Sequence, residues 1–145
     1  MNLGHISIFI AFLSAVGAAI LFIMKEKAGS MLKPAQPQSK WKKLFPVRLY
    51  YVSMATGLIA SVILYNALFT HQFQYSYVAH YSSSDLPLFY LISAFWAGQE
   101  GTFLLWAVMA AVMGLVFLRN TKNADGYAMA VVSLFIGFLY LILLS

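Results

Sequence analysis

Only a few side chains in this sequence could transfer protons or bind a metal ion. Glu100 has long apolar stretches on both sides, and an acid in such a place can relay protons or pair with a cation of another subunit. Structural hydrogen bonding to a neighbouring loop is the alternative role for it. The histidines His5, His71 and His80 could ligate haem or a metal ion, but separations of 66 and 9 residues match no compact ligand motif. We therefore expect exposed, interfacial histidines.

Other reactive groups are missing. The chain has no cysteine, so it offers no thiolate metal site, disulfide or redox dithiol. It also contains no phosphate-binding glycine loop, no zinc-ligand spacing and no recognisable Ser-His-Asp arrangement. The sequence thus predicts no catalytic residue and no metal site in this chain alone.

The elements that position these groups are predicted to be membrane helices. Of the 145 residues, 62% are hydrophobic and 9% charged, with a mean hydropathy of +0.81. The apolar runs are long enough to cross about 30 Å of hydrocarbon at about 1.5 Å per residue. The predicted fold class is an all-α integral membrane protein of about four transmembrane helices, forming a single transmembrane helical domain over residues 1–145. The expected spans are 3–24, 47–69, 99–118 and 127–144, with connecting loops at 25–46 and 70–88.

The basic residues predict the orientation of these helices. Seven of the nine lie between positions 25 and 48, and the other two are Arg119 and Lys122, whereas the loop 70–88 has none. Because Lys and Arg near membrane ends are retained on the cytoplasmic side, loop 25–46 is predicted to be cytoplasmic and loop 70–88 outer, with both termini outside. The prolines at 34, 37 and 46 indicate an extended cytoplasmic loop. The net charge of +5 is then an orientation signal, with membrane lipid as a partner and no nucleic acid.

The outer loop is rich in aromatic residues. Phe73, Tyr75 and Tyr77 recur at every second position, which is typical of one face of an extended strand or of a segment on the membrane surface. These rings form either an interfacial aromatic belt or a surface that packs on a partner or a flat ligand.

The third helix is predicted to be longer than the membrane is thick. Between Pro87 and Leu118 the chain is apolar except for Gln99 and Glu100, and a continuous helix of this length would measure roughly 48 Å. Counted from Arg119 at the cytoplasmic boundary, Glu100 falls roughly 28 Å away. This places its carboxylate near the outer edge of the hydrocarbon.

Two surfaces of that helix stand out. Small residues at every fourth position would let another helix approach closely; they are Ser93, Ala97 and Gly101 in one row and Ala94, Gly98 and Thr102 in the next. The opposite surface carries large rings beside one amide, which is typical of packing or of an aromatic belt; its members are Trp96, Gln99, Phe103 and Trp106.

The stretches YVAHYSSSDLPLFY at 77–90 and ISAFWAGQEGTFLLW at 92–106 resemble the N-terminal region of the CcmF/CycK/NrfE haem lyases of cytochrome c maturation. That family shows Tyr-Val, a serine-rich turn, Leu-Pro, a Tyr, an aromatic-Trp pair, Gly-x-Glu-Gly-Ser and Leu-Leu-Trp, with Thr102 here in the place of the usual Ser. His80 lies inside the segment but outside its pattern. The positions that carry over, as scaffold or as surface near a partner or haem, are Tyr77, Pro87, Tyr90, Trp96, Gly98, Glu100, Gly101 and Trp106.

The resemblance implies an N-terminal subunit or module of a haem lyase in a bacterial inner membrane. It would scaffold haem attachment to the Cys-x-x-Cys-His motifs of apocytochrome c on the outer face, beside other cytochrome c maturation subunits. In the family, the Trp-rich haem-handling signature and the haem-ligating histidines lie further along a longer chain. The resemblance therefore implies a second polypeptide that carries them and the haem, with no cofactor in this chain and no catalysis by it alone. A natural split protein and a truncated copy both fit.

A different class of function is also compatible with the residues. A small structural or proton-conducting subunit of a respiratory or transporter complex would use Glu100 as its ionisable group.

Overall fold

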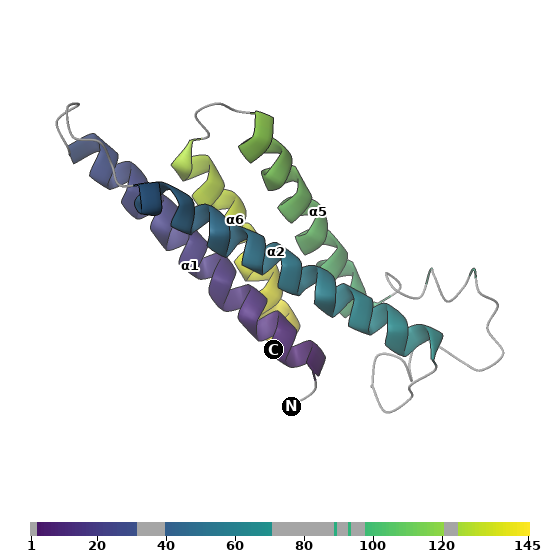
Figure 1. The fold of residues 1–145 in the computed structure, drawn as a ribbon. Coiled ribbons are helices and arrows are strands. Elements are labelled where there is room, and N and C mark those ends of the chain that lie inside the picture. Colours follow the sequence, from purple (N-terminus) through teal and green to yellow (C-terminus); the bar gives the residue numbers. More distant parts are fainter. Residues whose placement is uncertain (1–2, 32–39, 71–88, 90–92, 94–97, 121–124) are drawn as a thin grey trace.

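The computed structural model of the chain describes residues 3–31, 40–70, 89, 93, 98–120 and 125–145. All regular structure among these residues is α-helical, which confirms the predicted all-α class (Figure 1). The long helices are α1 (Leu3–Met31), α2 (Lys40–Phe69), α5 (Gln99–Asn120) and α6 (Gly126–Leu144).

All four long helices can cross a membrane by length and composition, over Leu3–Ala28, Leu44–Phe69, Gln99–Asn120 and Gly126–Leu144. The chain is therefore a multi-pass membrane protein. Its packing suits a lipid solvent, because large apolar side chains such as that of Met113, 71% exposed, cover the outside while the core is rich in alanine. Small residues at helix contacts let the backbones approach closely, and packing replaces the hydrophobic effect between helices in lipid.

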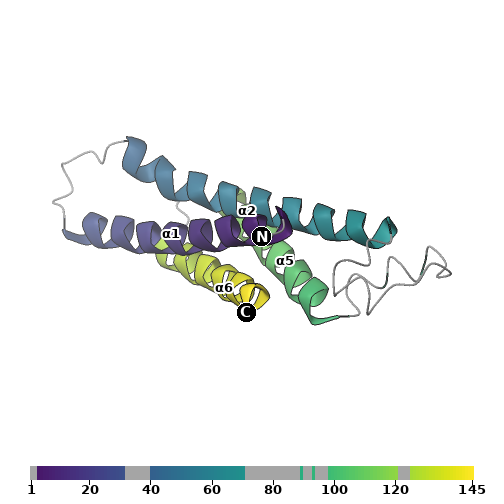
Figure 2. The same cartoon turned by 90° about the horizontal axis from the view of Figure 1, so that it is seen from below.

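The helices form a bundle in which α1 packs along both α2 and α6, as Figures 1 and 2 show. Helix α5 contacts α6 and, less extensively, α2. The start of α1 and the end of α6 lie at one end of the bundle, and the end of α1, the start of α2, the end of α5 and the start of α6 lie at the other (Figure 1). The basic residues at the end of α1, the start of α2 and the end of α5 therefore share one end of the bundle, as the predicted orientation requires. The side of the membrane to which each end belongs stays a prediction.

The helices run past the charges that bounded the predicted spans. Helix α1 continues to Met31 and α2 already begins at Lys40, because a charge ends the membrane-embedded part of a helix without ending its backbone hydrogen bonding. Pro46 lies inside α2 with its ring buried, so the expectation of an extended loop at this proline was wrong. Tertiary packing of the ring overrides its local preference.

Two predicted features lie largely outside the described residues. In the outer aromatic loop, 70–88, only Thr70 is described. In the predicted extension of the third helix before Gln99, the structure describes Phe89, Ser93 and Gly98, of which the first two are helical. The extension and the aromatic loop stay predictions.

Candidate functional site at one end of the bundle

A cavity of about 520 Å³ lies among the ends of the four helices, a volume within the range of small-molecule sites of about 300–1,000 Å³. Every long helix contributes to its lining. Much of the wall is apolar, as with Ile63, Phe103 and Leu143, and the polar side chains among the described lining residues include His5, Gln99 and Glu100. An apolar chamber with a few polar groups suits an amphipathic ligand.

Helix α5 directs Glu100 toward this cavity. Glu100 stands in a row three and four residues apart with residues that are buried in the bundle, namely Leu104, Ala107, Ala111 and Gly114. The row puts the carboxylate on the inward-facing side of α5 although the residue itself is exposed. It also lies in the first turn of α5, where the positive end of the helix dipole favours a negative charge.

The structure brings His5 to the same cavity as Glu100, although 95 positions separate them. His5 lies in the first turns of α1 and is exposed, as predicted for it. His71 and His80 lie outside the described residues. Within the described ranges, no group of three or more His, Cys, Asp or Glu side chains could hold a metal ion.

The remaining predicted site residues are distributed over different surfaces. Gly98 and Gly101 are buried, whereas Trp106 is 57% exposed on the outside of α5. The small-residue face is therefore not free for another helix at these two glycines, and the free face of α5 carries large side chains instead. The other four predicted positions lie outside the described residues: Tyr77, Pro87, Tyr90 and Trp96.

Inside the bundle, α2 makes a polar contact with two of its neighbours. The buried Tyr50 hydroxyl donates a hydrogen bond to the carbonyl of Ala111 on α5 at 2.7 Å. The buried Ser53 hydroxyl donates to the carbonyl of Ala11 on α1 at 3.0 Å. Tyr50 and Ser53 were not among the predicted site residues, because they bond backbone carbonyls, and a backbone carbonyl leaves no signal in the pattern of side chains.

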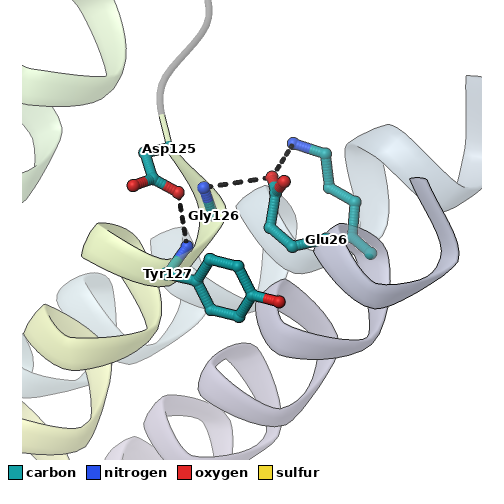
Figure 3. A network of polar contacts seen from close by, with 5 residues as sticks. Glu26, Asp125, Gly126 and Tyr127 are labelled. Atoms are coloured by element: carbon teal, nitrogen blue, oxygen red, sulfur yellow. Dashed lines mark hydrogen bonds and ion pairs between the residues drawn. The ribbon is translucent and has the colours of Figure 1, made fainter. Parts of the chain in front are cut away.

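The opposite end of the bundle is tied by carboxylates (Figure 3). Glu26 on α1 accepts a hydrogen bond from the backbone N–H of Gly126 at 3.1 Å, and it lies 3.9 Å from the ammonium group of Lys25. Asp125 caps α6 by accepting from the N–H of Tyr127 at 3.0 Å. Two carboxylates thus satisfy N–H groups that the first turn of a helix leaves without an intrahelical partner.

The known proteins that are similar to this chain are cytochrome c-type biogenesis proteins. A CcmF protein of Pseudomonas fluorescens is 34% identical over 110 residues, which cover 74% of this chain and 15% of the relative. An NrfE protein of Haemophilus influenzae is 29% identical over 125 residues, covering 84% of this chain and 18% of the relative. This chain is a homologue of part of the CcmF and NrfE proteins.

The predicted resemblance to the CcmF/NrfE group is thus confirmed. A CcmF protein of Escherichia coli is also 34% identical over 61 residues, which cover 42% of this chain. All three relatives are described as cytochrome c-type biogenesis proteins. The matched part spans less than a fifth of the length of each. No protein-family model matches the chain, and no solved structure matches it either.

Proposed function

We propose that this chain is the N-terminal subunit or module of a cytochrome c maturation haem lyase, which scaffolds haem attachment to apocytochrome c on the outer face of a bacterial inner membrane. The observation that carries the proposal is the 34% identity to a CcmF protein over 74% of the chain. The four membrane-spanning helices support it, because such a scaffold must be held in the membrane.

The proposal includes a second polypeptide of the haem lyase. Since the chain matches 15% of its CcmF relative, most of such a protein has no counterpart here. We assign the Trp-rich signature and the haem-ligating histidines to a second haem lyase polypeptide, which assembles with this chain, other cytochrome c maturation subunits and apocytochrome c.

The described residues do not fit a haem site of their own. The described lining residues supply one imidazole, that of His5, and include no second histidine, cysteine or methionine that could complete an axial pair. We therefore assign haem to the partner chain and a positioning role to this one. In that role the four helices hold the outer end of the bundle against the partner.

A deletion strain of the organism that encodes the chain tests the proposal. Deletion is expected to abolish covalent haem in c-type cytochromes, measured by haem-dependent peroxidase staining after denaturing electrophoresis, and the wild-type chain is expected to restore it. Affinity purification from the restored strain, followed by mass spectrometry, is expected to recover a Trp-rich membrane polypeptide. In Gly101→Gln, a bulky polar group at a buried position should lower maturation, whereas Asn120→Gln at the exposed end of the same helix should not.

Normal cytochrome c maturation in the deletion strain would contradict the proposal, as would recovery of the chain with no second polypeptide. If maturation is normal and Glu100→Gln abolishes proton-coupled activity while the complex still assembles, the chain is a respiratory or transporter subunit instead.

A further inference from the structure

The cavity lies at the level of the lipid headgroups. Two of the spans begin at Leu3 and Gln99, and the other two end at Phe69 and Leu144. The lining includes His5, Ala67 and Leu144, each within two residues of such an end. A chamber at the ends of all four spans opens where hydrocarbon gives way to headgroups and water.

The described lining of the cavity carries negative charge without a basic side chain to balance it. Glu100 is the one acidic side chain among the described residues that line it, and none of them is a lysine or arginine. Glu100 has no ion pair within the described ranges. The described basic residues lie toward the other end of the helices, roughly 28 Å away in the case of Arg119. A cation that neutralises Glu100 must therefore come from outside this part of the chain.

The chemistry of the lining selects among lipid headgroups. A quaternary ammonium such as choline is recognised by a cage of Phe, Tyr or Trp faces, and Phe103 is the one such residue among the described lining residues. A primary ammonium has three N–H donors and can bond a carboxylate directly. The Gln99 amide and the His5 ring can donate to the phosphate of the same headgroup, and the apolar wall can accommodate the start of its acyl chains.

We propose that this cavity binds one aminophospholipid of the phosphatidylethanolamine class, with the ammonium group on Glu100 and the phosphate beside Gln99 and His5. A headgroup with a net negative charge is disfavoured by repulsion from Glu100. The proposal does not depend on the function proposed above, because the site lies within this chain.

Native mass spectrometry of the purified full chain in detergent tests the proposal. The probes are phosphatidylethanolamine, phosphatidylcholine and phosphatidylglycerol with identical acyl chains. One phosphatidylethanolamine is expected to stay bound at about tenfold lower lipid concentration than either other lipid. Glu100→Gln is expected to remove this preference, whereas Glu26→Gln, which removes a carboxylate at the opposite end of the bundle, should keep it.

Gln99→Leu is the second variant, because Gln99 is exposed and its loss leaves the core intact. It should weaken phosphatidylethanolamine binding several-fold while the helix content, measured by circular dichroism, stays unchanged. Equal retention of the three lipids by the wild type, an unchanged preference in Glu100→Gln, or unchanged phosphatidylethanolamine binding in Gln99→Leu overturns the proposal. No cytochrome c maturation component enters the measurement, so its failure leaves the proposed function untouched.

Discussion

Tyr50 and Tyr140 are both buried in the bundle, with 1% and 0% of their surfaces exposed, but their hydroxyl groups differ. The hydroxyl of Tyr50 donates to a backbone carbonyl. The hydroxyl of Tyr140 has no hydrogen-bond partner among the described residues, although Ser53 lies beside it. A buried polar group without a partner costs about 1–3 kcal/mol.

The two tyrosines therefore predict opposite effects of the same substitution. Tyr50→Phe should lower the free energy of unfolding by about 0.5–1.5 kcal/mol, because it removes a hydrogen bond. Tyr140→Phe should leave stability unchanged or raise it. The measurement is unfolding by sodium dodecyl sulfate in mixed micelles, followed by circular dichroism. Equal losses in the two variants would show instead that Tyr140 is hydrogen-bonded.

Gly57 makes room for Tyr140 where α2 meets α6. A Cβ atom at position 57 would overlap the Tyr140 hydroxyl oxygen and lie 3.0 Å from the ring carbon that bears it. Because Tyr140 is fully enclosed, Gly57→Ala should cost about 1–3 kcal/mol of stability. Adding Tyr140→Phe should recover part of this loss in the same unfolding assay, since the hydroxyl makes the closest contact.

Gly4→Ala is the matched control for that substitution. A Cβ there would lie 3.9 Å from Ile63, an ordinary contact distance. Its stability should equal or slightly exceed that of the wild type, because alanine favours a helix. A loss in Gly4→Ala as large as in Gly57→Ala would contradict the close-packing argument.

At the scale of the elements, one hydrogen bond joins the end of α1 to the beginning of α6. Gly126 leaves room for the Glu26 side chain there, because a Cβ atom would lie 2.5 Å from the Glu26 carboxylate oxygen. Gly126→Ala should displace Glu26 and expose the N–H groups of the first turn of α6. Glu26→Gln keeps a hydrogen-bond acceptor but loses the negative charge that the helix dipole favours. This loss should lower the free energy of unfolding by about 0.3–1 kcal/mol.

Hydrogen exchange measures this junction directly. Exchange of the amides in the first turn of α6 should accelerate most in Gly126→Ala and less in Glu26→Gln. Asp125→Asn is the control, because asparagine is an equally good N-cap. Unchanged exchange in Gly126→Ala would mean that the contact between Glu26 and α6 does not stabilise this turn.

For the whole molecule, the bundle predicts which positions face the same compartment. Both termini lie at one end (Figure 1), and the basic residues favour the cytoplasm at the other end. Because the chain has no cysteine, single-cysteine variants give an unambiguous readout. In cells whose outer membrane has been permeabilised, Ser145→Cys should react with a membrane-impermeant maleimide. Gln38→Cys should react only after the cells are lysed. The reverse labelling pattern would show that the orientation is opposite to the predicted one.

The sequence predicted the helices better than it predicted the contacts between them. The apolar runs predicted the number and approximate position of the helices that can span a membrane. The inward direction of Glu100 and its place in the same cavity as His5 were not predicted, and neither was the close approach of Gly57 to Tyr140. These features depend on how far each helix is rotated about its axis.

Length, composition and the motif at 77–106 were enough to determine a multi-pass helical membrane protein related to CcmF and NrfE. Only the tertiary structure decided which faces meet and that four helix ends enclose a cavity around Glu100. The physical reason lies in the solvent. In water an apolar stripe marks the inward face of a helix, but lipid is as apolar as the core, so these helices are apolar on nearly every side. Their rotation is then set by close packing of small residues and by single hydrogen bonds.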